Sequence, residues 1–181
     1  ATRRDLLALM NAGAARNAVD CALWDLDAKI SGRRVAETLG SPAPKPLETA
    51  YTLSLAEPEA MHAQARENAW RPLLKVKVGT PQDEPRMRAV ATGAPNSRII
   101  LDANEGWTPE NIVQNLALAA ELGIALIEQP LKAGGDAMLG EIAHPVPICA
   151  DESVHTAEDL EQLAGLYDAV NIKLDKSGGL T

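Results

Sequence analysis

The chain has 181 residues, 46% of them apolar and 23% charged, and its formal net charge at pH 7 is −8. This composition is that of a globular protein that can bury a sizeable core. A negative chain without a basic face matches neither nucleic acid nor an anionic membrane surface, so we exclude both partners and expect a small-molecule ligand.

The first 40 residues have the apolar periodicity of helices. Gly32 provides an end signal for the longest of them, which we expect to pack through its apolar face. Three prolines in SPAPKP, residues 41–46, then indicate a linker. We therefore expect residues 1–45 to form a helical domain with its linker and residues 46–181 to form a second domain. The apolar face consists of Val19, Leu23, Leu26 and Ile30.

Beyond the linker, six short β-like runs alternate with helical segments, which is typical of a parallel sheet in an α/β fold. Thr108-Pro109 is expected to start one helix, Gly123 to end it, and Thr156 with Asp159 to form a capping box. The β-like runs are YTLSL at 51–55, LLKVKV at 73–78, RIILD at 98–102, IALIE at 124–128, PICAD at 147–151 and AVNIKL at 169–174.

A charged residue closes five of these runs, at intervals of 22 to 26 residues. A (β/α)8 barrel builds its active site at the carboxyl ends of its strands, so the five residues would converge there. A doubly wound sheet instead binds ligand at one switch point and explains the pattern less well. We therefore predict about six strands of a (β/α)8-type barrel. The five residues are Lys77, Asp102, Glu128, Asp151 and Lys173.

These residue types suggest a particular chemistry. Carboxylates from three adjacent strands form an all-oxygen set that suits Mg²⁺ or Mn²⁺. A nearby cation, a neighbouring lysine and desolvation each lower a lysine pKa, so a neutral lysine could act as a base. If the metal holds a substrate carboxylate, the adjacent proton becomes removable through a metal-stabilised enediolate. Two lysines on opposite sides of that carbon would then racemise or epimerise it.

Five motifs in this order resemble the muconate lactonizing enzyme subgroup of the enolase superfamily, and within it the dipeptide epimerases. The opening helices, residues 15–29, are similar to that family's capping domain. The motifs are KVK at 75–77, LDANEGW at 101–107, EQPL at 128–131, ADES at 150–153 and NIKLDKSGGLT at 171–181.

The resemblance implies metal ligands Asp102, Glu128 and Asp151, with Lys77 and Lys173 as the two acid/base groups. Lys75 would be an auxiliary lysine that tunes Lys77. The implied activity is Mg²⁺-dependent 1,1-proton transfer on a dipeptide of the L-Ala-D/L-Glu type, as in murein-peptide turnover, with no organic cofactor. The family's motif that recognises the substrate ammonium group does not occur in this sequence, so substrate choice rests on resemblance.

Other functions stay open at this point. The same chemistry serves N-acylamino acid racemases, o-succinylbenzoate synthases and cycloisomerases. A hypothesis of a different class is an inactive partial barrel that only associates through exposed strand edges. A homo-oligomer is also open.

Several residues have a plainer interpretation. Lys75 and Lys77 could extend to solvent from an edge strand, Asp102 could cap a turn, and Glu152 competes with its neighbour Asp151. Lys176 competes with Lys173, although strand alternation places Lys173 on the other face. The remaining groups are expected to be structural: His62, His144 and His155 at the surface or at helix ends, and Trp24, Trp70 and Trp107 in packing, with Trp107 the one that could approach the site.

Neither a disulfide framework nor a zinc site is indicated, because Cys21 and Cys149 are far apart and no Cys-x-x-Cys occurs. The longest apolar stretch, residues 112–127, contains three polar residues, and no leader pattern opens the chain. We expect a cytoplasmic protein.

Overall fold

The computed structural model describes residues 2–181, which fall into two compact units. Unit 1 contains the residues up to Leu47 together with Val154–Leu160 and Ile172–Thr181. Unit 2 contains Glu48–Ser153 and Glu161–Asn171. Each unit is described separately. The division expected from sequence, at residues 45 and 46, stays a prediction.

Unit 2 is built on a six-stranded parallel sheet in which the strands follow one another in chain order. Each strand lies within one of the six β-like runs, so the α/β prediction is confirmed. The strands are β1 (Tyr51–Leu53), β2 (Leu73–Lys77), β3 (Arg98–Asp102), β4 (Leu126–Glu128), β5 (Ile148–Ala150) and β6 (Ala169–Val170).

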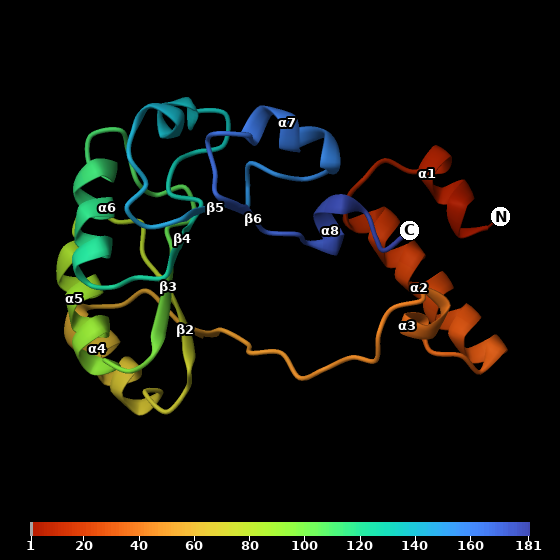
Figure 1. The fold of residues 1–181 in the computed structure, drawn as a ribbon, viewed down its shortest axis with the longest axis horizontal. Helices are drawn as coiled ribbons and strands as arrows, with labels where there is room; N and C mark the ends of the chain where they lie inside the picture. The colour runs from red at the N-terminus through yellow and green to blue at the C-terminus, as the bar shows by residue number, and fades with distance from the viewer. Residues whose placement is uncertain (1) are drawn as a thin grey trace. The chain divides into compact units, whose positions relative to one another are not determined.

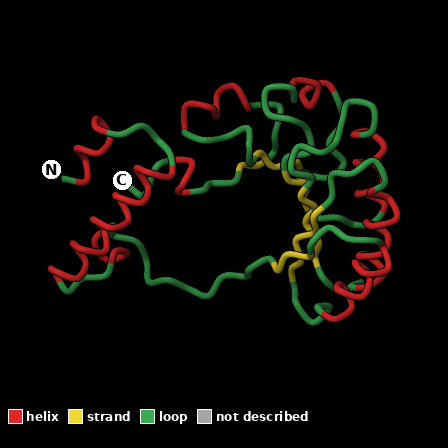
Figure 2. Tube along the Cα trace, turned by 180° about the vertical axis from the view of Figure 1, so that it is seen from behind, coloured by secondary structure: helices red, strands yellow, loops and turns green. Residues whose placement is uncertain are grey.

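Helices follow the strands of unit 2, and α4, α5 and α6 lie along one face of the sheet (Figure 1 and Figure 2). The helices are α4 (Pro58–Glu67), α5 (Asp83–Gly93), α6 (Ile112–Glu121), the 3₁₀ helix η2 (Ala137–Glu141) and α7 (Leu160–Leu163), whose first residue belongs to unit 1.

Strand alternation divides the side chains of the sheet between two faces. In β2, Leu74 and Val76 are fully buried in the same apolar core as residues of α4, α5 and α6, which leaves Lys75 and Lys77 on the opposite face. Burying the apolar face drives the folding of this unit. The opposite face is therefore the one that can carry polar groups without interrupting the core.

Strand β6 is shorter than the sequence pattern predicted. The pattern AVNIKL indicated a strand through residue 174, but β6 ends at Val170 and Leu174 begins the helix α8 (Leu174–Ser177). The carbonyl of Lys173 accepts hydrogen bonds from the backbone N–H groups of Lys176 and Ser177, which starts a helical turn. Lys173 therefore precedes a helix instead of closing a strand, and Lys176 lies within that helix.

Unit 1 is helical, as predicted for the start of the chain. The helix α2 ends at Gly32, whose φ of 66° is the left-handed conformation that glycine adopts readily. The packing expected for its apolar face is wrong for three of the four residues, because Val19, Leu26 and Ile30 are exposed. The helices are η1 (Arg3–Asp5), α1 (Leu6–Leu9), α2 (Ala14–Ser31), α3 (Val35–Thr38), η3 (Ala157–Asp159) and α8.

Of the predicted helix boundaries, one was wrong. The helix α6 begins at Ile112 rather than at Thr108, because Thr108 and Asn111 first form a turn in which Asn111 Oδ1 accepts a hydrogen bond from the Thr108 N–H. Gly123 follows the end of α6 with a φ of 68°, as predicted. The capping box of Thr156 and Asp159 is also confirmed. Within residues 2–181, no helix combines the length and apolarity needed to cross a bilayer.

Candidate active site

Charged side chains meet at the carboxyl ends of neighbouring strands in unit 2. The register of the sheet pairs Lys77 with Asp102, Asp102 with Glu128, and Glu128 with Cys149. Asp151 follows Cys149 by two residues, which keeps it on the same face if the strand alternation continues. The register thus brings Lys77, Asp102 and Glu128 to neighbouring ends of β2, β3 and β4, and the place of Asp151 in the site stays a prediction.

Lys75 forms the centre of this group. Its Nζ atom lies 2.9 Å from Asp102 Oδ2 and 2.6 Å from Glu128 Oε2, and Lys77 Nζ lies 2.7 Å from the same Asp102 oxygen. The strand β2 pairs with β1 on one side and β3 on the other, so the interpretation of Lys75 and Lys77 as edge-strand lysines is wrong. Both carboxylates are almost completely buried, which makes their neutralisation by lysine necessary in this arrangement.

The pKa shifts at this group follow from burial and from its charges. Desolvation acts to lower the pKa of Lys75, but hydrogen bonds and charge interactions with Glu128 and Asp102 outweigh it and raise the pKa. The lowered lysine pKa expected beside a bound cation concerns the two acid/base lysines and stays a prediction. The pKa of Glu128 is raised mainly by burial, and the carboxylates of Asp102 and Asp151 add to the effect, while Lys75 opposes it. Negative charge is thus concentrated here.

The three acids offer carboxylate oxygens only, a donor set that fits Mg²⁺. In this arrangement the ammonium group of Lys75 lies between two of them, Asp102 and Glu128. Among residues 2–181, no three or more Asp, Glu, His or Cys side chains are grouped closely enough to hold a metal ion. A cation at this place would therefore have to displace Lys75 from the carboxylates.

Asn104 is part of the group, although sequence reasoning did not single it out. Its Oδ1 accepts a hydrogen bond of 2.5 Å from Lys77 Nζ, and its Nδ2 donates to Glu152 Oε1 at 3.1 Å. Its backbone N–H donates to Asp102 Oδ1, so Asp102 also caps this turn, as the alternative interpretation proposed. A φ of 42° at Asn104 marks the turn, and an asparagine two residues after a strand-end aspartate is the signal that could have identified it.

The end of β6 also reaches the group. Asn171 Nδ2 donates a hydrogen bond of 2.8 Å to Glu128 Oε1. Lys173 follows Asn171 by two residues but belongs to unit 1, where it is the residue before α8. Its predicted role as the second acid/base group stays a prediction.

Trp107 is a packing residue, as expected. It is buried, and its Nε1–H donates a hydrogen bond of 2.8 Å to Asp83 Oδ2. Asp83 also accepts hydrogen bonds from the backbone N–H groups of Gly79 and Thr80. Trp107 therefore connects the loops that follow β2 and β3 and makes no hydrogen bond to the charged group.

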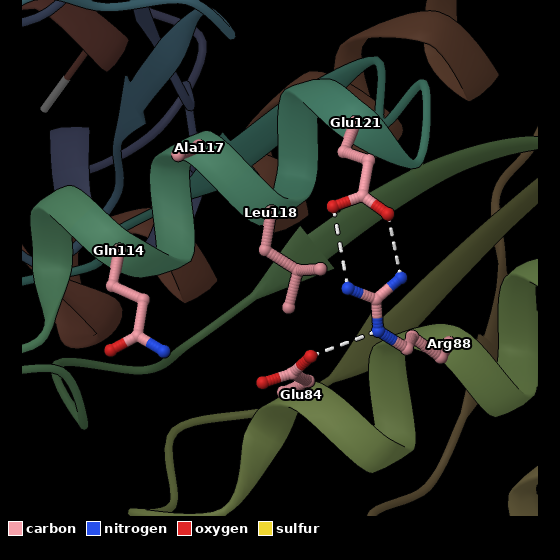
Figure 3. Close-up of a pocket in the computed structure, with 6 residues that line it drawn as sticks. All are labelled: Glu84, Arg88, Gln114, Ala117, Leu118 and Glu121. Atoms are coloured by element: carbon pink, nitrogen blue, oxygen red, sulfur yellow. Dashed lines mark hydrogen bonds and ion pairs between the residues drawn. The ribbon is translucent and has the colours of Figure 1, made fainter.

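A surface pocket of about 250 Å³ lies between α5 and α6 and is lined by none of the charged residues of the strand ends (Figure 3). Arg88 crosses it and forms ion pairs with Glu84 on its own helix and Glu121 on the neighbouring one. In these ion pairs the charged side chains of the pocket neutralise one another. We therefore assign the candidate active site to the strand ends and not to this pocket.

Two family models match the chain. The model of the mandelate racemase / muconate lactonizing enzyme N-terminal domain matches residues 2–40, and the enolase C-terminal domain-like model matches residues 59–181. The second match includes every residue of the strand-end group as well as Lys173.

Curated relatives are similar over almost the whole chain. An L-Ala-D/L-Glu epimerase from Escherichia coli is 46% identical over 99% of this chain and 57% of its own length. An N-acetyl-D-glutamate racemase from Pseudoalteromonas is 48% identical over 98% of this chain and 56% of its own length. The chain thus spans just over half the length of these relatives.

Solved structures of enolase family members are also similar to this chain. An enolase family member from Agrobacterium tumefaciens with homology to dipeptide epimerases, with bound sodium and L-Ala-L-Glu, has 65% identity and a TM-score of 0.96, over 99% of this chain and 55% of that one. A dipeptide epimerase from Cytophaga hutchinsonii, complexed with Mg and D-Ala-L-Val, has 33% identity and a TM-score of 0.83, over 91% of this chain and 47% of that one.

Proposed function

The chain belongs to the mandelate racemase / muconate lactonizing enzyme family of the enolase superfamily, and from this premise we propose that its protein is a dipeptide epimerase. The substrate would be of the L-Ala-D/L-Glu type, and the reaction would invert the α carbon of its glutamate residue. The observation that carries the proposal is the group formed by Lys75, Lys77, Asp102 and Glu128 at adjacent strand ends, in a chain 46% identical to an L-Ala-D/L-Glu epimerase.

The acids Asp102, Glu128 and Asp151 would hold Mg²⁺, with Mn²⁺ as a substitute. The bound cation would supply positive charge beside the substrate carboxylate, which makes the hydrogen on the adjacent carbon easier to remove. The concentration of negative charge at Glu128 supports this assignment, because the acids then gain more from a divalent cation than from one ammonium group.

The lysines would move the proton. Lys77 has a side chain that is one-third exposed and could reach a substrate carbon. We assign it to the S face of that carbon because the resemblance to the family implies this role. Lys173 would act from the R face, as the resemblance to the family implies. Lys75 would act as the auxiliary lysine, because its ammonium group shares Asp102 with Lys77. We further propose that the reaction serves murein-peptide turnover in the cytoplasm.

The test is proton exchange in D₂O. The intact protein with Mg²⁺ and L-Ala-D-Glu should incorporate deuterium at the α position of the glutamate residue and form L-Ala-L-Glu, as read by NMR. Removing Mg²⁺ with EDTA should stop both. A protein that binds Mg²⁺ and leaves the α hydrogen in place would contradict the proposal.

A second candidate is racemisation of an N-acyl glutamate, which the 48% identity with an N-acetyl-D-glutamate racemase favours. Both reactions invert the α carbon of a glutamate unit and need the same strand-end group. The ratio of kcat/KM for L-Ala-D-Glu to that for N-acetyl-D-glutamate separates them. A ratio above one supports the dipeptide, and a ratio well below one supports the acyl amino acid.

A further inference from the structure

Gln129 connects the strands that carry two of the proposed metal ligands. It follows Glu128 directly, is completely buried and has a φ of 37°, which few residues other than glycine adopt. Its side-chain Oε1 accepts hydrogen bonds from the backbone N–H of Asp151 at 2.8 Å and from that of Ser153 at 3.1 Å. The position of Asp151 thus depends on how this amide is held.

The other end of the amide meets a second set of polar groups. Nε2 lies 2.7 Å from Ser153 Oγ and 2.9 Å from Tyr167 Oη, and it also contacts the backbone carbonyl of Leu131 at 2.9 Å. The hydroxyl groups of Ser153 and Tyr167 both lie 2.6 Å from one oxygen of Asp136, and Asp136 is itself buried.

The hydrogen atoms of this set can be placed by elimination. A carboxylate only accepts hydrogen bonds, so the hydroxyl hydrogens of Ser153 and Tyr167 point to Asp136. Their oxygens are then left to accept hydrogen bonds, which suits the NH₂ group of Gln129. This forces Oε1 of Gln129 toward the backbone N–H groups of Asp151 and Ser153. The Leu131 carbonyl, which also only accepts, selects the same orientation, so Asp136 adds to the hydrogen bonds that hold the amide through two hydroxyl groups.

We propose that Asp136, Ser153, Tyr167 and Gln129 form a positioning network that holds Asp151 at a fixed place relative to Glu128. The proposal rests on the proposed function, because it treats Glu128 and Asp151 as metal ligands. None of the four residues would touch the substrate. Residues that orient ligands in this way commonly change metal affinity by about 10- to 100-fold when they are replaced.

The sharpest variant is Tyr167→Phe, which removes one oxygen from a half-buried ring and leaves the packing volume nearly unchanged. Tyr51→Phe is a matched control, because Tyr51 is an exposed tyrosine outside the network. In the intact protein, Tyr167→Phe should weaken Mg²⁺ binding about 10-fold or more in calorimetry. It should also speed amide hydrogen exchange in the peptide that contains residues 151–153. The control should change neither quantity by more than about twofold.

A second variant, Ser153→Ala, removes the other hydroxyl that donates to Asp136 and should have the same effects. At saturating Mg²⁺, both variants should recover most of the wild-type kcat, because the ligands themselves are intact. This recovery would not follow from a purely structural defect, which would lower the melting temperature at unchanged Mg²⁺ affinity.

The outcomes separate this proposal from the proposed function. Unchanged Mg²⁺ affinity and unchanged exchange in both variants would overturn the positioning network, whatever the activity. A wild-type protein that binds Mg²⁺ but exchanges no α hydrogen would overturn the epimerase function and leave the network standing. A wild-type protein that binds no Mg²⁺ would overturn both.

Discussion

Lys75 shows how the site balances its charges at the level of single residues. Its ammonium group is shared by Asp102 and Glu128, which are 1% and 3% exposed and would otherwise be buried anions without a counter-charge. Removing one partner of a buried ion pair costs more than the pair contributes, because the remaining charge is left uncompensated. The lysine therefore stabilises the fold when no cation is bound.

Lys75→Met should for this reason destabilise the metal-free protein by up to about 3 kcal/mol. This is the lower end of the cost of removing one partner of a buried ion pair, and we expect it because Lys75 is partly exposed. Mg²⁺ should reduce the loss, because it binds only the folded state and replaces the missing positive charge. Thermal unfolding with EDTA and with Mg²⁺ measures both effects. Lys29→Met is the control, because Lys29 pairs with Asp25 at an exposed position. Equal losses in EDTA and in Mg²⁺ would contradict a cation site at this place.

Asp168 gives the fold a pH dependence that is separate from the site. Burial acts to raise its pKa, but hydrogen bonds from the Ile148 N–H and from His144 outweigh it, so the pKa lies below its usual value. A lowered pKa in the folded state means that the stabilisation is present above the unfolded pKa of about 3.9 and is lost as the pH falls through the folded value.

Asp168→Asn should therefore lower the melting temperature by about 2–4 °C at pH 7. The difference from wild type should shrink as the pH falls below about 4, where the wild-type carboxylate becomes protonated. Melting curves between pH 3 and pH 7 provide the test, with the exposed Asp25→Asn as control. A difference in melting temperature that grows toward acid pH would contradict a stabilising role of the Asp168 carboxylate.

The sequence predicted charged residues more reliably than amides. Lys77, Asp102 and Glu128 could be found because a charge at the end of an apolar run repeats with each strand and helix. Asn104 and Gln129 could not, because polar residues after a strand also suit an ordinary turn. Their partners, such as Glu152 and Tyr167, come from later strands and loops, and only the folded sheet brings these together.

At the level of elements, the loops after β2 and β3 are held in close backbone contact. A Cβ atom at Gly106 would overlap the backbone of Gly79, and Gly79 itself has a φ of 108°. These loops directly follow Lys77 and Asp102, so their fit determines where both charges lie. Glycine is required here for space as well as for conformation.

Gly106→Ala should lower the unfolding free energy by about 3 kcal/mol, which is the upper end of the range for overpacking. We expect the upper end because the new Cβ would overlap backbone atoms, which cannot change rotamer as a side chain can. Gly135→Ala is the matched control, since its Cβ would lie 3.4 Å from the Lys132 carbonyl in an ordinary contact, and it should change stability by less than about 0.5 kcal/mol. Urea unfolding measures both. Equal stabilities of the two variants would contradict the close contact.

The strands were predictable because runs rich in apolar and β-branched residues are separated by clear turn signals. The end of β6 was not, since Ile172 and Leu174 continue the apolar alternation after the backbone has left the sheet. The start of α6 was missed for a related reason: Thr108-Pro109 is a good helix start, but Asn111 closes a turn first.

At the level of the whole molecule, segments far apart in sequence form each unit. The segment after Lys173 belongs to unit 1, because Arg16 of α2 donates hydrogen bonds to the carbonyls of Ser177 and Gly178, and Asp20 accepts them from the N–H groups of Leu180 and Thr181. A division of the sequence at the proline-rich linker cannot show that the last residues of the chain belong to the same unit as the first helices. The contacts depend on glycines at 178 and 179, where a Cβ would overlap Arg16 and Asp20.

The proposed chemistry needs two lysines, Lys77 and Lys173, on opposite faces of one substrate carbon. The most direct measurement follows α-hydrogen exchange in D₂O by the intact protein carrying Lys77→Met or Lys173→Met, with Mg²⁺ present. In both variants the rate of epimerisation should fall by about 10²- to 10⁴-fold relative to wild type. Lys173→Met should still exchange L-Ala-L-Glu, and Lys77→Met should still exchange L-Ala-D-Glu. Near-normal epimerisation by either variant, or exchange of the same diastereomer by both, would contradict a site with two lysines on opposite faces.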